Sequence, residues 1–411
     1  MALEDKARVP KLRFPEFEGD WLTQKLSKVL KKKSARNSVG RFSKSDVLSV
    51  SGEHGVVNQI AHLGRSYAGE SVEDYHVVDT GDIVYTKSPL KSNPYGIIRA
   101  NLGRPGIVST LYAVYQVRSG HSYDFVNRYF ESDDRTNKYL RPLVNKGAKN
   151  DMKISNERVL IDPVSFPSIA EQKKIAACLS AIDAKIGAVR EKEAALARFK
   201  RGLMQALFTR TLRFTRDDGS SYPDWEEKLF RDVAEFSKGK GIARSDIAED
   251  GELRCIRYGE LYTDYSEIIS TVHSRTNLPA SELILSKQYD VIIPASGEDR
   301  LDMARACCVL EKDVALGGDI NIIRSDFNGP FLAYYLSNAK RKEIARFAQG
   351  NSVVHLYGTQ LKQLTIAVPH PDEQQKIVNA LSGLDARLTA AKKEITRLER
   401  YKAGLLQQMF V

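Results

Sequence analysis

Two stretches of this chain, Glu171-Gln172-Lys173-Lys174-Ile175 and Glu373-Gln374-Gln375-Lys376-Ile377, are almost identical and open a long internal repeat. The match continues at a constant offset, without a gap, as far as Phe208 in the first copy and Phe410 in the second. A repeat of about 40 residues indicates two copies of one structural unit. The chain is therefore expected to perform two equivalent tasks.

Both repeated stretches are predicted to be long helices with a seam of apolar residues spaced four and three apart. Such a seam on helices rich in Lys, Arg, Glu and Ala is typical of a coiled coil. Charged residues interrupt the seam at Glu193, Lys200 and Lys402. Its apolar members are Ile175, Leu179, Ile182, Ile186, Val189, Leu196 and Leu203 in the first copy, and Ile377, Leu381, Leu384, Leu388, Ala391, Ile395, Leu398 and Leu405 in the second.

The lengths of these segments favour antiparallel packing of the two helices. A helix of about 40 residues is about 60 Å long, whereas a globular domain of about 160 residues is only about 40 Å across. Parallel helices would oblige the second domain to carry the chain back over the length of the first helix. We therefore expect an antiparallel two-helix coiled coil with a globular domain at each end, in a pseudo-two-fold, nearly circular arrangement.

Each predicted helix follows a region whose sequence pattern is typical of an α+β globular domain. Short β-branched and aromatic runs bounded by Gly, Pro, Asn and Ser predict strands, and residues 331–336 predict a helix. The predicted strands cover residues 46–50, 82–85, 106–108, 290–293 and 319–323. The two regions have largely diverged, which we interpret as two different specificities.

Both globular regions open alike. The first follows Leu12-Arg13-Phe14-Pro15-Glu16-Phe17-Glu18-Gly19-Asp20-Trp21, and the second follows a relic that runs from Leu212-Arg213-Phe214 to Tyr222-Pro223-Asp224-Trp225. The only two tryptophans of the chain occupy matching places, and each is expected to anchor its domain. The start of each long helix needs an N-terminal cap or a residue with a fixed φ. These positions are occupied by Pro167-Ser168 in the first copy and Pro371-Asp372 in the second.

The composition indicates a polyanionic partner and gives no sign of a catalytic centre. Lys plus Arg exceed Asp plus Glu by 62 to 52, a formal charge of +10, and such a surplus suggests nucleic acid. The sequence contains no P-loop, no histidine pair at zinc-site spacing and no CxxC motif among its four cysteines.

No apolar run is long enough to span a membrane, and the acidic N-terminus lacks the order of a secretion signal, so a cytoplasmic protein is expected.

Polar clusters in the globular regions are candidates for contacts with DNA. Basic runs suggest phosphate contacts, and Arg, Lys, Asn and Gln side chains suit base edges. The candidates are Lys31, Lys32, Arg36, Lys87, Lys91, Asn93, Lys146, Lys149, Asn150 and Lys153 in the first region, and Arg257, Ser296, Arg300, Gln349, Asn351 and His355 in the second. For each residue an ordinary exposed polar role is an open alternative.

The chain resembles, over essentially its full length, the DNA-specificity subunit of Type I restriction-modification systems. The resemblance rests first on the opening segment at 12–21 and its relic at 212–225. It rests also on the helix starts of the form Pro-x-x-x-Glu-Gln-x-Lys-Ile, at 167–175 and, shortened, at 369–377. The third feature is Arg257-Tyr258-Gly259-Glu260-Leu261. In that family two target-recognition domains each read one part of a split, asymmetric DNA sequence, and two helical regions form the spacer. Thr215-Arg216-Asp217-Asp218 replaces the Pro-Glu-Phe part of the opening segment, so the equivalence is looser there.

The resemblance also implies partner subunits. The helical regions would bind two methyltransferase subunits, which use S-adenosylmethionine to methylate adenine, and motor-nuclease subunits join for restriction. This chain itself would bind no cofactor and no metal. The residues expected to bind the partner belong to the apolar seam: Ile175, Leu179, Ile182, Ile186, Leu196, Leu203, Ile377, Leu381, Leu384, Leu388, Leu398 and Leu405.

The predicted organisation is a target-recognition domain over residues 1–165, a helix over 166–211, a second domain over 212–367 and a helix over 368–411. The expected function is that of a non-enzymatic, sequence-specific DNA-binding subunit for double-stranded DNA. The helices would separate the half-site centres by about one turn of DNA, and lengthening one helix by about four residues should lengthen the preferred spacer. Two alternatives stay open: a self-contained DNA methyltransferase or nuclease, and a coiled-coil scaffold whose globular ends bind proteins.

Overall fold

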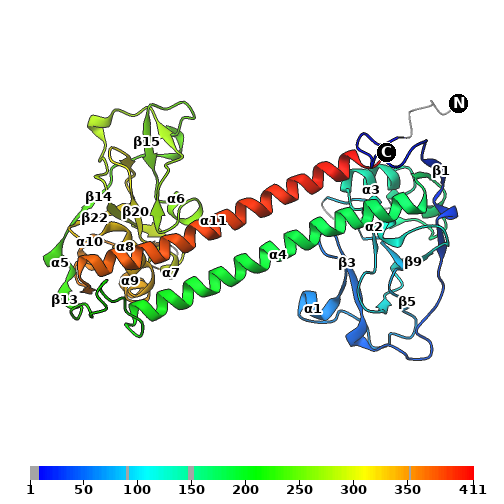
Figure 1. Cartoon of the computed structure of the whole chain (residues 1–411), viewed down its shortest axis with the longest axis horizontal. Helices are drawn as coiled ribbons and strands as arrows, with labels where there is room; N and C mark the ends of the chain where they lie inside the picture. The colour runs from blue at the N-terminus through cyan, green and yellow to red at the C-terminus, as the bar shows by residue number, and fades with distance from the viewer. Residues whose placement is uncertain (1–8, 89–91, 147–151, 351–352) are drawn as a thin grey trace. The chain divides into compact units, whose positions relative to one another are not determined.

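The computed structural model describes residues 9–88, 92–146, 152–350 and 353–411 of the chain. The polypeptide divides into two compact units, coloured along the chain in Figure 1. Unit 1 comprises residues 1–190 and 393–411, and unit 2 comprises residues 191–392. Both units combine helices with sheets, so the predicted α+β class is confirmed, whereas the pseudo-two-fold arrangement of the whole stays a prediction.

Two long helices occupy the repeated stretches, as predicted. Helix α4 spans Ile169–Phe208 and helix α11 spans Pro371–Gln408, with 40 and 38 residues. Ser168 caps α4, because its hydroxyl accepts a hydrogen bond from the Glu171 amide at 3.4 Å. Pro371 is the first residue of α11, where its missing N–H costs nothing. No helix in the described part of the chain is both long and apolar enough to cross a membrane.

The parts of α4 and α11 that share a unit run antiparallel. In unit 1, Asp183 of α4 pairs with Lys402 of α11 at 2.6 Å, and Arg190 pairs with Glu399, also at 2.6 Å. A residue later in α4 therefore contacts a residue earlier in α11. The predicted antiparallel coiled coil is confirmed for this unit.

Unit 2 contains the same antiparallel arrangement. Glu193 lies 4.0 Å from Lys392, and Lys200 pairs with Asp385 at 2.7 Å. The charged residues that interrupt the apolar seam thus each form an ion pair with the other helix. They are Glu193, Lys200 and Lys402. Lys200 and Lys402 are largely buried, with side chains 10% and 17% exposed, so their pairs with Asp385 and Asp183 favour the register in which the helices meet.

The globular part of unit 1 packs short helices against small antiparallel sheets. Its helices are α1 (Gln59–Leu63), α2 (Tyr123–Tyr129) and α3 (Asp133–Leu140). Its strands are β1 (Leu22–Lys25), β2 (Leu30–Lys32), β3 (Leu48–Ser51), β4 (Gly55–Asn58), β5 (His76–Val78), β6 (Ile83–Thr86), β7 (Ile97–Ala100), β8 (Gly106–Val108), β9 (Tyr112–Val117), β10 (Asn145–Lys146), β11 (Met152–Lys153) and β12 (Pro163–Phe166). The largest sheet has the order β2-β9-β6-β7.

The globular part of unit 2 is built in the same way with a larger sheet. Its helices are α5 (Phe230–Val233), α6 (Glu260–Thr263), α7 (Arg300–Met303), α8 (Gly329–Asn338), α9 (Arg341–Phe347) and α10 (Gly358–Leu361). Its strands are β13 (Glu226–Leu229), β14 (Ala234–Lys238), β15 (Leu253–Ile256), β16 (Ile268–Ile269), β17 (Arg275–Thr276), β18 (Asp290–Pro294), β19 (Ser296–Gly297), β20 (Cys307–Val309), β21 (Ala315–Leu316), β22 (Ile320–Ser325), β23 (Val354–His355) and β24 (Thr365–Val368). The five predicted strands correspond to β3, β6, β8, β18 and β22, with ends shifted by a few residues.

The two globular parts share one sheet topology although their sequences have diverged. The order β2-β9-β6-β7 in unit 1 corresponds to β14-β22-β18-β20 in unit 2, to which β16 is added. A separate antiparallel pair joins the first strand of each part to its last, β1 with β12 and β13 with β24. The duplication therefore extends from the helices through the globular parts.

The start of each long helix anchors the tryptophan that opens the adjoining globular part. In unit 1 the buried Glu171 accepts two hydrogen bonds from Arg13, both at 2.8 Å, and one from the Trp21 indole at 3.3 Å. In unit 2 Glu373 accepts the same bonds from Arg213 and Trp225, at 2.9–3.2 Å. The prediction that the tryptophans are structural anchors is confirmed.

The looser equivalence expected at residues 215–218 has little structural consequence. Lys174 of α4 pairs with Glu16 and lies over the Phe14 ring. In unit 2 the corresponding Lys376 pairs with Asp217 at 2.6 Å. Asp217 thus takes the place of Glu16, and the contact survives the change of sequence.

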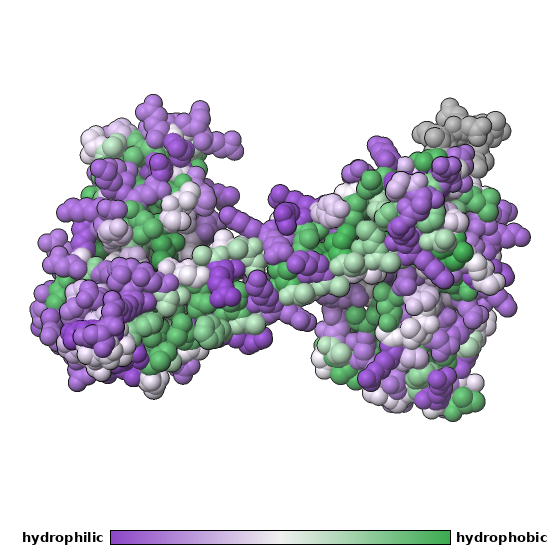
Figure 2. Space-filling view, in the orientation of Figure 1, coloured by the Kyte–Doolittle hydropathy of each residue, from purple (hydrophilic) through white to green (hydrophobic). Residues whose placement is uncertain are grey.

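The hydrophobic core of each unit includes the apolar seam of the helices. In unit 1, Ile175, Leu179 and Leu405 are buried together with Trp21 and the aromatic residues of α2. In unit 2, Ile377 and Leu381 are buried with Trp225 and the residues of α8. The amide of Leu12 also donates to Gln408 at 3.0 Å, so both ends of the described chain lie together in unit 1. Figure 2 shows mostly hydrophilic surface on the face in view, with hydrophobic patches that include parts of the long helices.

Candidate nucleic-acid interface

Three of the predicted basic residues of unit 1 lie around one buried histidine beside its main sheet. β2 and β6 both pair with β9, and the chain leaves them at Lys32 and just before Lys87. Arg36 forms an isolated β-bridge to His76, the first residue of β5. The charges of Arg36, Lys87 and Lys32 all act on the His76 ring and lower its pKa. The sequence predicted the three cations, and the structure brings them together.

His76 lies at the centre of this group, which we call the basic cluster: Lys32, Arg36, His76 and Lys87. Its side chain is 5% exposed, and its Nδ1 atom is buried without a hydrogen-bond partner. Burial and the three neighbouring cations lower the His76 pKa from 6.5 to about 4. The imidazole is therefore neutral at pH 7. No sequence motif marked this histidine, because its neighbours come from three separate segments.

The buried neutral imidazole makes the stability of unit 1 depend on pH. The unfolded chain binds a proton at His76 near pH 6.5, whereas the folded unit does so only near pH 4. Acidification between these values should therefore destabilise the fold, by at most about 1.4 kcal/mol per pH unit. Urea unfolding at several pH values should show a shallower pH dependence for His76→Gln. His62→Gln, at an exposed position, should keep the wild-type dependence; equal curves for both variants would contradict this assignment.

The ammonium group of Lys87 is half-buried without a salt-bridge or hydrogen-bond partner among the described residues. Burial lowers its pKa, and the nearby Lys32 lowers it further. Lys32 itself pairs with Glu157 at 2.6 Å, and the Arg36 guanidinium donates to the backbone carbonyl of Asp74. A partly buried cation without a partner costs free energy unless an anion binds it. A DNA phosphate would be such an anion.

The remaining predicted residues of unit 1 have different environments. Lys31 is exposed on β2. Lys146 and Lys153 lie on the paired strands β10 and β11. Lys91, Lys149 and Asn150 lie outside the described residues. Asn93 is a correction: its side chain is 2% exposed and donates to Asp133 at 3.0 Å, so it holds the loop onto α3 and offers no free amide to a base.

Four of the predicted residues of unit 2 also lie together, where the chain leaves β18. Ser296 of β19 pairs with His355 of β23, and the backbones of His355 and Gln349 exchange two hydrogen bonds. Arg300 donates to the Gly350 carbonyl at 3.1 Å. Gln349 and Arg300 are exposed, and His355 stacks on the half-exposed ring of Tyr357. Asn351 lies outside the described residues.

Two of the candidates in unit 2 have mainly structural contacts. Ser296 is 6% exposed and its hydroxyl is buried, so a base contact by this side chain is not available in this conformation. Arg257 pairs with the buried Glu260 at 3.3 Å, and Glu260 also accepts from Ser274 at 2.8 Å. Arg257 therefore orders the loop before α6. Tyr357, an aromatic residue of the kind on which bases stack, was not among the predicted residues.

The corresponding places in the two units thus carry different polar groups. The end of β6 in unit 1 is surrounded by Lys32, Arg36 and Lys87, whereas the end of β18 in unit 2 is surrounded by Arg300, Gln349 and His355. Within the described part of the chain, no group of three or more His, Cys, Asp or Glu side chains could hold a metal ion. The arrangement suits binding of a polyanion more than chemistry on a small substrate.

The apolar seam does not form an open partner surface, which corrects the prediction. The seam residues pack inside the chain's own units, because each helix finds its apolar partner in the other helix and in the adjoining globular part. Buried members are Ile175, Leu179, Ile186, Leu196, Ile377, Leu381, Leu384 and Leu405, and partly buried members are Ile182, Leu203, Leu388 and Leu398.

Comparisons with known proteins agree with this architecture. Residues 222–400 match the family described as Type I restriction modification DNA specificity domain. The specificity subunit of the Type I restriction enzyme MjaVIII from Methanocaldococcus jannaschii is 24% identical over 267 residues, which is 59% of this chain and 60% of that relative. Residues 222–400 therefore match a Type I restriction modification DNA specificity domain, and the chain is similar to Type I restriction enzyme specificity subunits.

Solved structures of Type I restriction-modification proteins are similar to this chain in fold. The S subunit of the Type I restriction-modification system from M. genitalium has a TM-score of 0.59 at 14% identity, over 98% of this chain and 99% of that chain. A chain from a study of complex assembly and conformational transition in a Type I system has a TM-score of 0.53 at 17% identity, over 95% and 97% of the two chains. The specificity-subunit fold therefore persists at low sequence identity.

Proposed function

We propose that this chain is a non-catalytic DNA-specificity subunit in which each unit reads one half of a bipartite, asymmetric site in double-stranded DNA. The supporting observation is that the two duplicated units are alike in strand order but unlike in the polar residues at corresponding places. The main sheets of the two units share the order of four strands, but the residues around the ends of β6 and β18 differ. Lys and Arg favour guanine edges and phosphates, whereas Gln favours adenine, so unlike groups on like scaffolds suit two different DNA sequences.

The proposed division of labour assigns the chemistry to partner subunits. Two methyltransferase subunits would bind S-adenosylmethionine and methylate adenine, and motor-nuclease subunits would join them for restriction. This chain would bind neither the cofactor nor a metal. Its contribution would be to hold the DNA and to present two equivalent docking faces, one for each methyltransferase.

The outer faces of the long helices supply such an equivalent pair. Phe199 on α4 is 61% exposed, and Tyr401, at the matching place of the repeat on α11, is 58% exposed. We call these two surfaces the outer faces: Arg198, Phe199, Gly202 and Gln205 on α4, and Arg400, Tyr401, Gly404 and Gln407 on α11. A large aromatic residue kept exposed in both copies has no role in the core, and aromatic side chains commonly dominate binding at interfaces.

The glycines of the outer faces leave room for another helix to approach. A Cβ atom on Gly202 would meet no heavy atom within 4 Å, and one on Gly404 would meet only the Gln408 side chain, at 3.9 Å. Internal packing therefore does not require glycine at either position. An aromatic residue beside a glycine is a surface suited to docking of a helix from the methyltransferase subunit.

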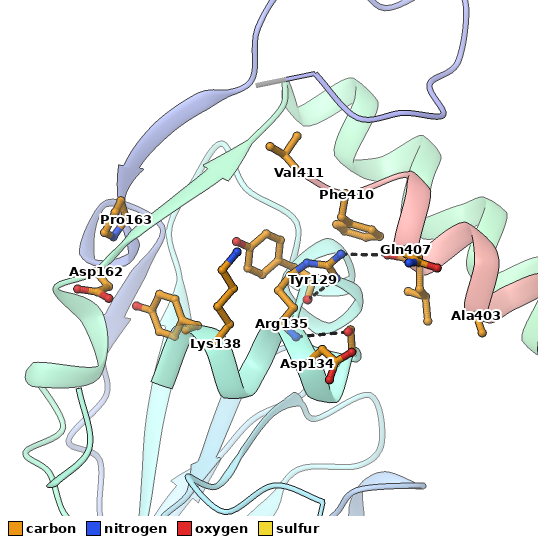
Figure 3. A pocket seen from close by; sticks show the side chains of 13 residues that line it. Tyr129, Asp134, Arg135, Lys138, Asp162, Pro163, Ala403, Gln407, Phe410 and Val411 are labelled. Atoms are coloured by element: carbon orange, nitrogen blue, oxygen red, sulfur yellow. Dashed lines mark hydrogen bonds between the residues drawn. The ribbon is translucent and has the colours of Figure 1, made fainter. Parts of the chain in front are cut away.

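In unit 1 the outer face borders a cleft of about 720 Å³ between α3 and the end of α11 (Figure 3). Arg135 closes its floor by donating to the Leu406 carbonyl at 3.0 Å and to the Tyr129 carbonyl at 3.1 Å, and it lies over the Phe410 ring. Gln407 belongs both to the cleft and to the outer face. The cleft therefore extends the surface that a partner could cover in this unit.

The proposal is tested by co-expressing the chain with a methyltransferase subunit from the same genome and mapping methylated adenines by modified-base sequencing. A bipartite, asymmetric motif with a fixed spacer is expected. Replacing Gln349 and Arg300 together should change only one half of that motif. Methylation at an undivided motif, or methyl transfer by the purified chain alone, would overturn the proposal.

A further inference from the structure

The basic cluster of unit 1 contains two polar groups that lack a partner in the structure. Nδ1 of His76 is buried with no hydrogen bond, in a side chain that is 5% exposed. The half-buried ammonium group of Lys87 has no ion pair within the described ranges. Buried polar groups normally have partners, so the unsatisfied Nδ1 atom of His76, with the half-buried Lys87 beside it, points to a missing ligand.

The charges around the cluster specify the sign of that ligand. Lys32 on β2, Arg36 on the segment that bridges β5, and Lys87 after β6 all act on His76, and each makes the ring harder to protonate. Glu157 is the carboxylate that acts on Lys87 and Lys32, and it is already engaged by Lys32 at 2.6 Å. Three cations against one carboxylate leave the cluster positive, so the ligand is an anion.

The neighbouring acidic residues do not change this balance. Asp79 and Asp82 share the single cation Lys33, which pairs with Asp79 at 2.7 Å and with Asp82, and neither carboxylate is among the charges that act on His76 or Lys87. Asp74 meets Arg36 through its backbone carbonyl and not through its carboxylate. The cluster therefore has no internal anion to complete Lys87 and His76.

We propose that Lys32, Arg36, Lys87 and His76 form a proton-linked phosphate site that holds one backbone phosphate of the DNA bound by unit 1. This inference rests on the proposed function for the identity of its ligand, but the anion site stands on the cluster alone. Lys87, with Lys32 and Arg36, supplies the positive charge. Burial and the three cations keep the free imidazole neutral. His76 takes up a proton from solution when the phosphate arrives, because the phosphate charge offsets the part of the pKa shift that the cations cause.

The proton uptake makes DNA affinity depend on pH with a defined sign. In the free protein the His76 pKa is about 4, so the ring is neutral across the physiological range. Phosphate binding raises this pKa, so the bound form carries more protons than the free form. By linkage, affinity rises as the pH falls below the pKa of the bound form, by up to about tenfold per pH unit. Above that pKa the affinity should be independent of His76.

The experiment measures binding of the full-length chain to a fluorescein-labelled duplex of mixed sequence, by anisotropy, as a function of pH and salt. Wild type should bind more tightly on acidification at constant salt, and His76→Gln should show a flat profile. Lys87→Gln should weaken binding and reduce the slope of log K against log salt by about one. The matched controls, His62→Gln and Lys28→Gln, alter exposed residues of unit 1 outside the cluster and should behave as wild type.

A wild-type pH profile in His76→Gln, or an unchanged salt slope in Lys87→Gln, would overturn the proposal. Circular dichroism of each variant at each pH excludes unfolding as the cause of a change. Inorganic phosphate serves as the second probe: it should raise the Tm of wild type more than that of Lys87→Gln. A chain that binds inorganic phosphate at this cluster but binds no DNA retains the anion site and loses the proposed function, so the two failures are distinguishable.

Discussion

Replacing Glu171 by alanine is expected to destabilise unit 1 by about 3 kcal/mol, because a buried charge would lose its partner. Its carboxylate is 1% exposed and accepts three hydrogen bonds, two from the Arg13 guanidinium and one from the Trp21 indole. Without it, Arg13 stays 13% exposed with an uncompensated charge, and the indole N–H is left unpaired. Urea unfolding followed by tryptophan fluorescence measures the loss.

The repeat provides an internal replicate of this prediction. Glu373→Ala removes the same acceptor from Arg213 and Trp225 and should produce a similar loss in unit 2. Glu191→Ala changes an exposed carboxylate of α4 and should alter stability by less than about 0.5 kcal/mol. If Glu171→Ala were as mild as Glu191→Ala, the anchoring role assigned to the carboxylate would be wrong.

The long helices could be predicted because their periodicity is local information. Alternation of four and three residues between apolar positions specifies a helical seam without knowledge of its partner. The antiparallel direction also followed from chain length, since it depends only on how far the intervening residues reach. Strand positions were predictable to within a few residues for the same reason, because β-branched runs bounded by turn residues are local signals.

The roles of several residues could not be predicted because their partners lie far away in sequence. Lys402 looked like an interruption of the seam, yet it pairs with Asp183 across the coiled coil. Glu171 was visible as part of a motif, but nothing in the motif indicated that Arg13 and Trp21 bind it. His76 was one histidine among seven, and its buried position depends on strands β5 and β8 and on the bridge to Arg36.

The apolar seam was predicted to be a partner surface, but its residues are buried or partly buried within the chain, for a physical reason. A seam of apolar residues indicates that something covers it, but periodicity does not say whether the cover comes from the same chain. Here each helix covers the other, and the adjoining globular part covers the rest. The polar side of the helices then becomes the outer face, where Phe199 and Tyr401 stand out as exposed aromatic residues.

Under the proposed function, replacing both Phe199 and Tyr401 by alanine is expected to weaken assembly with methyltransferase subunits strongly. Truncating a central aromatic residue of an interface typically costs at least about 2 kcal/mol, or roughly 30-fold in affinity. Each single variant should therefore bind one partner copy normally and the other weakly, since each unit carries one of the two equivalent outer faces. Native mass spectrometry of the co-expressed complex distinguishes zero, one and two bound copies.

The controls for this prediction use exposed apolar residues elsewhere on each unit. Leu111 in unit 1 is 66% exposed and Leu301 in unit 2 is 47% exposed, and neither belongs to a long helix. Leu111→Ala and Leu301→Ala should leave two partner copies bound. Because Phe199 and Tyr401 are exposed, their removal should leave the free energy of unfolding almost unchanged, so loss of assembly would report on docking and not on folding. A double variant that still carries two methyltransferase subunits would show that partners dock elsewhere than on the outer faces.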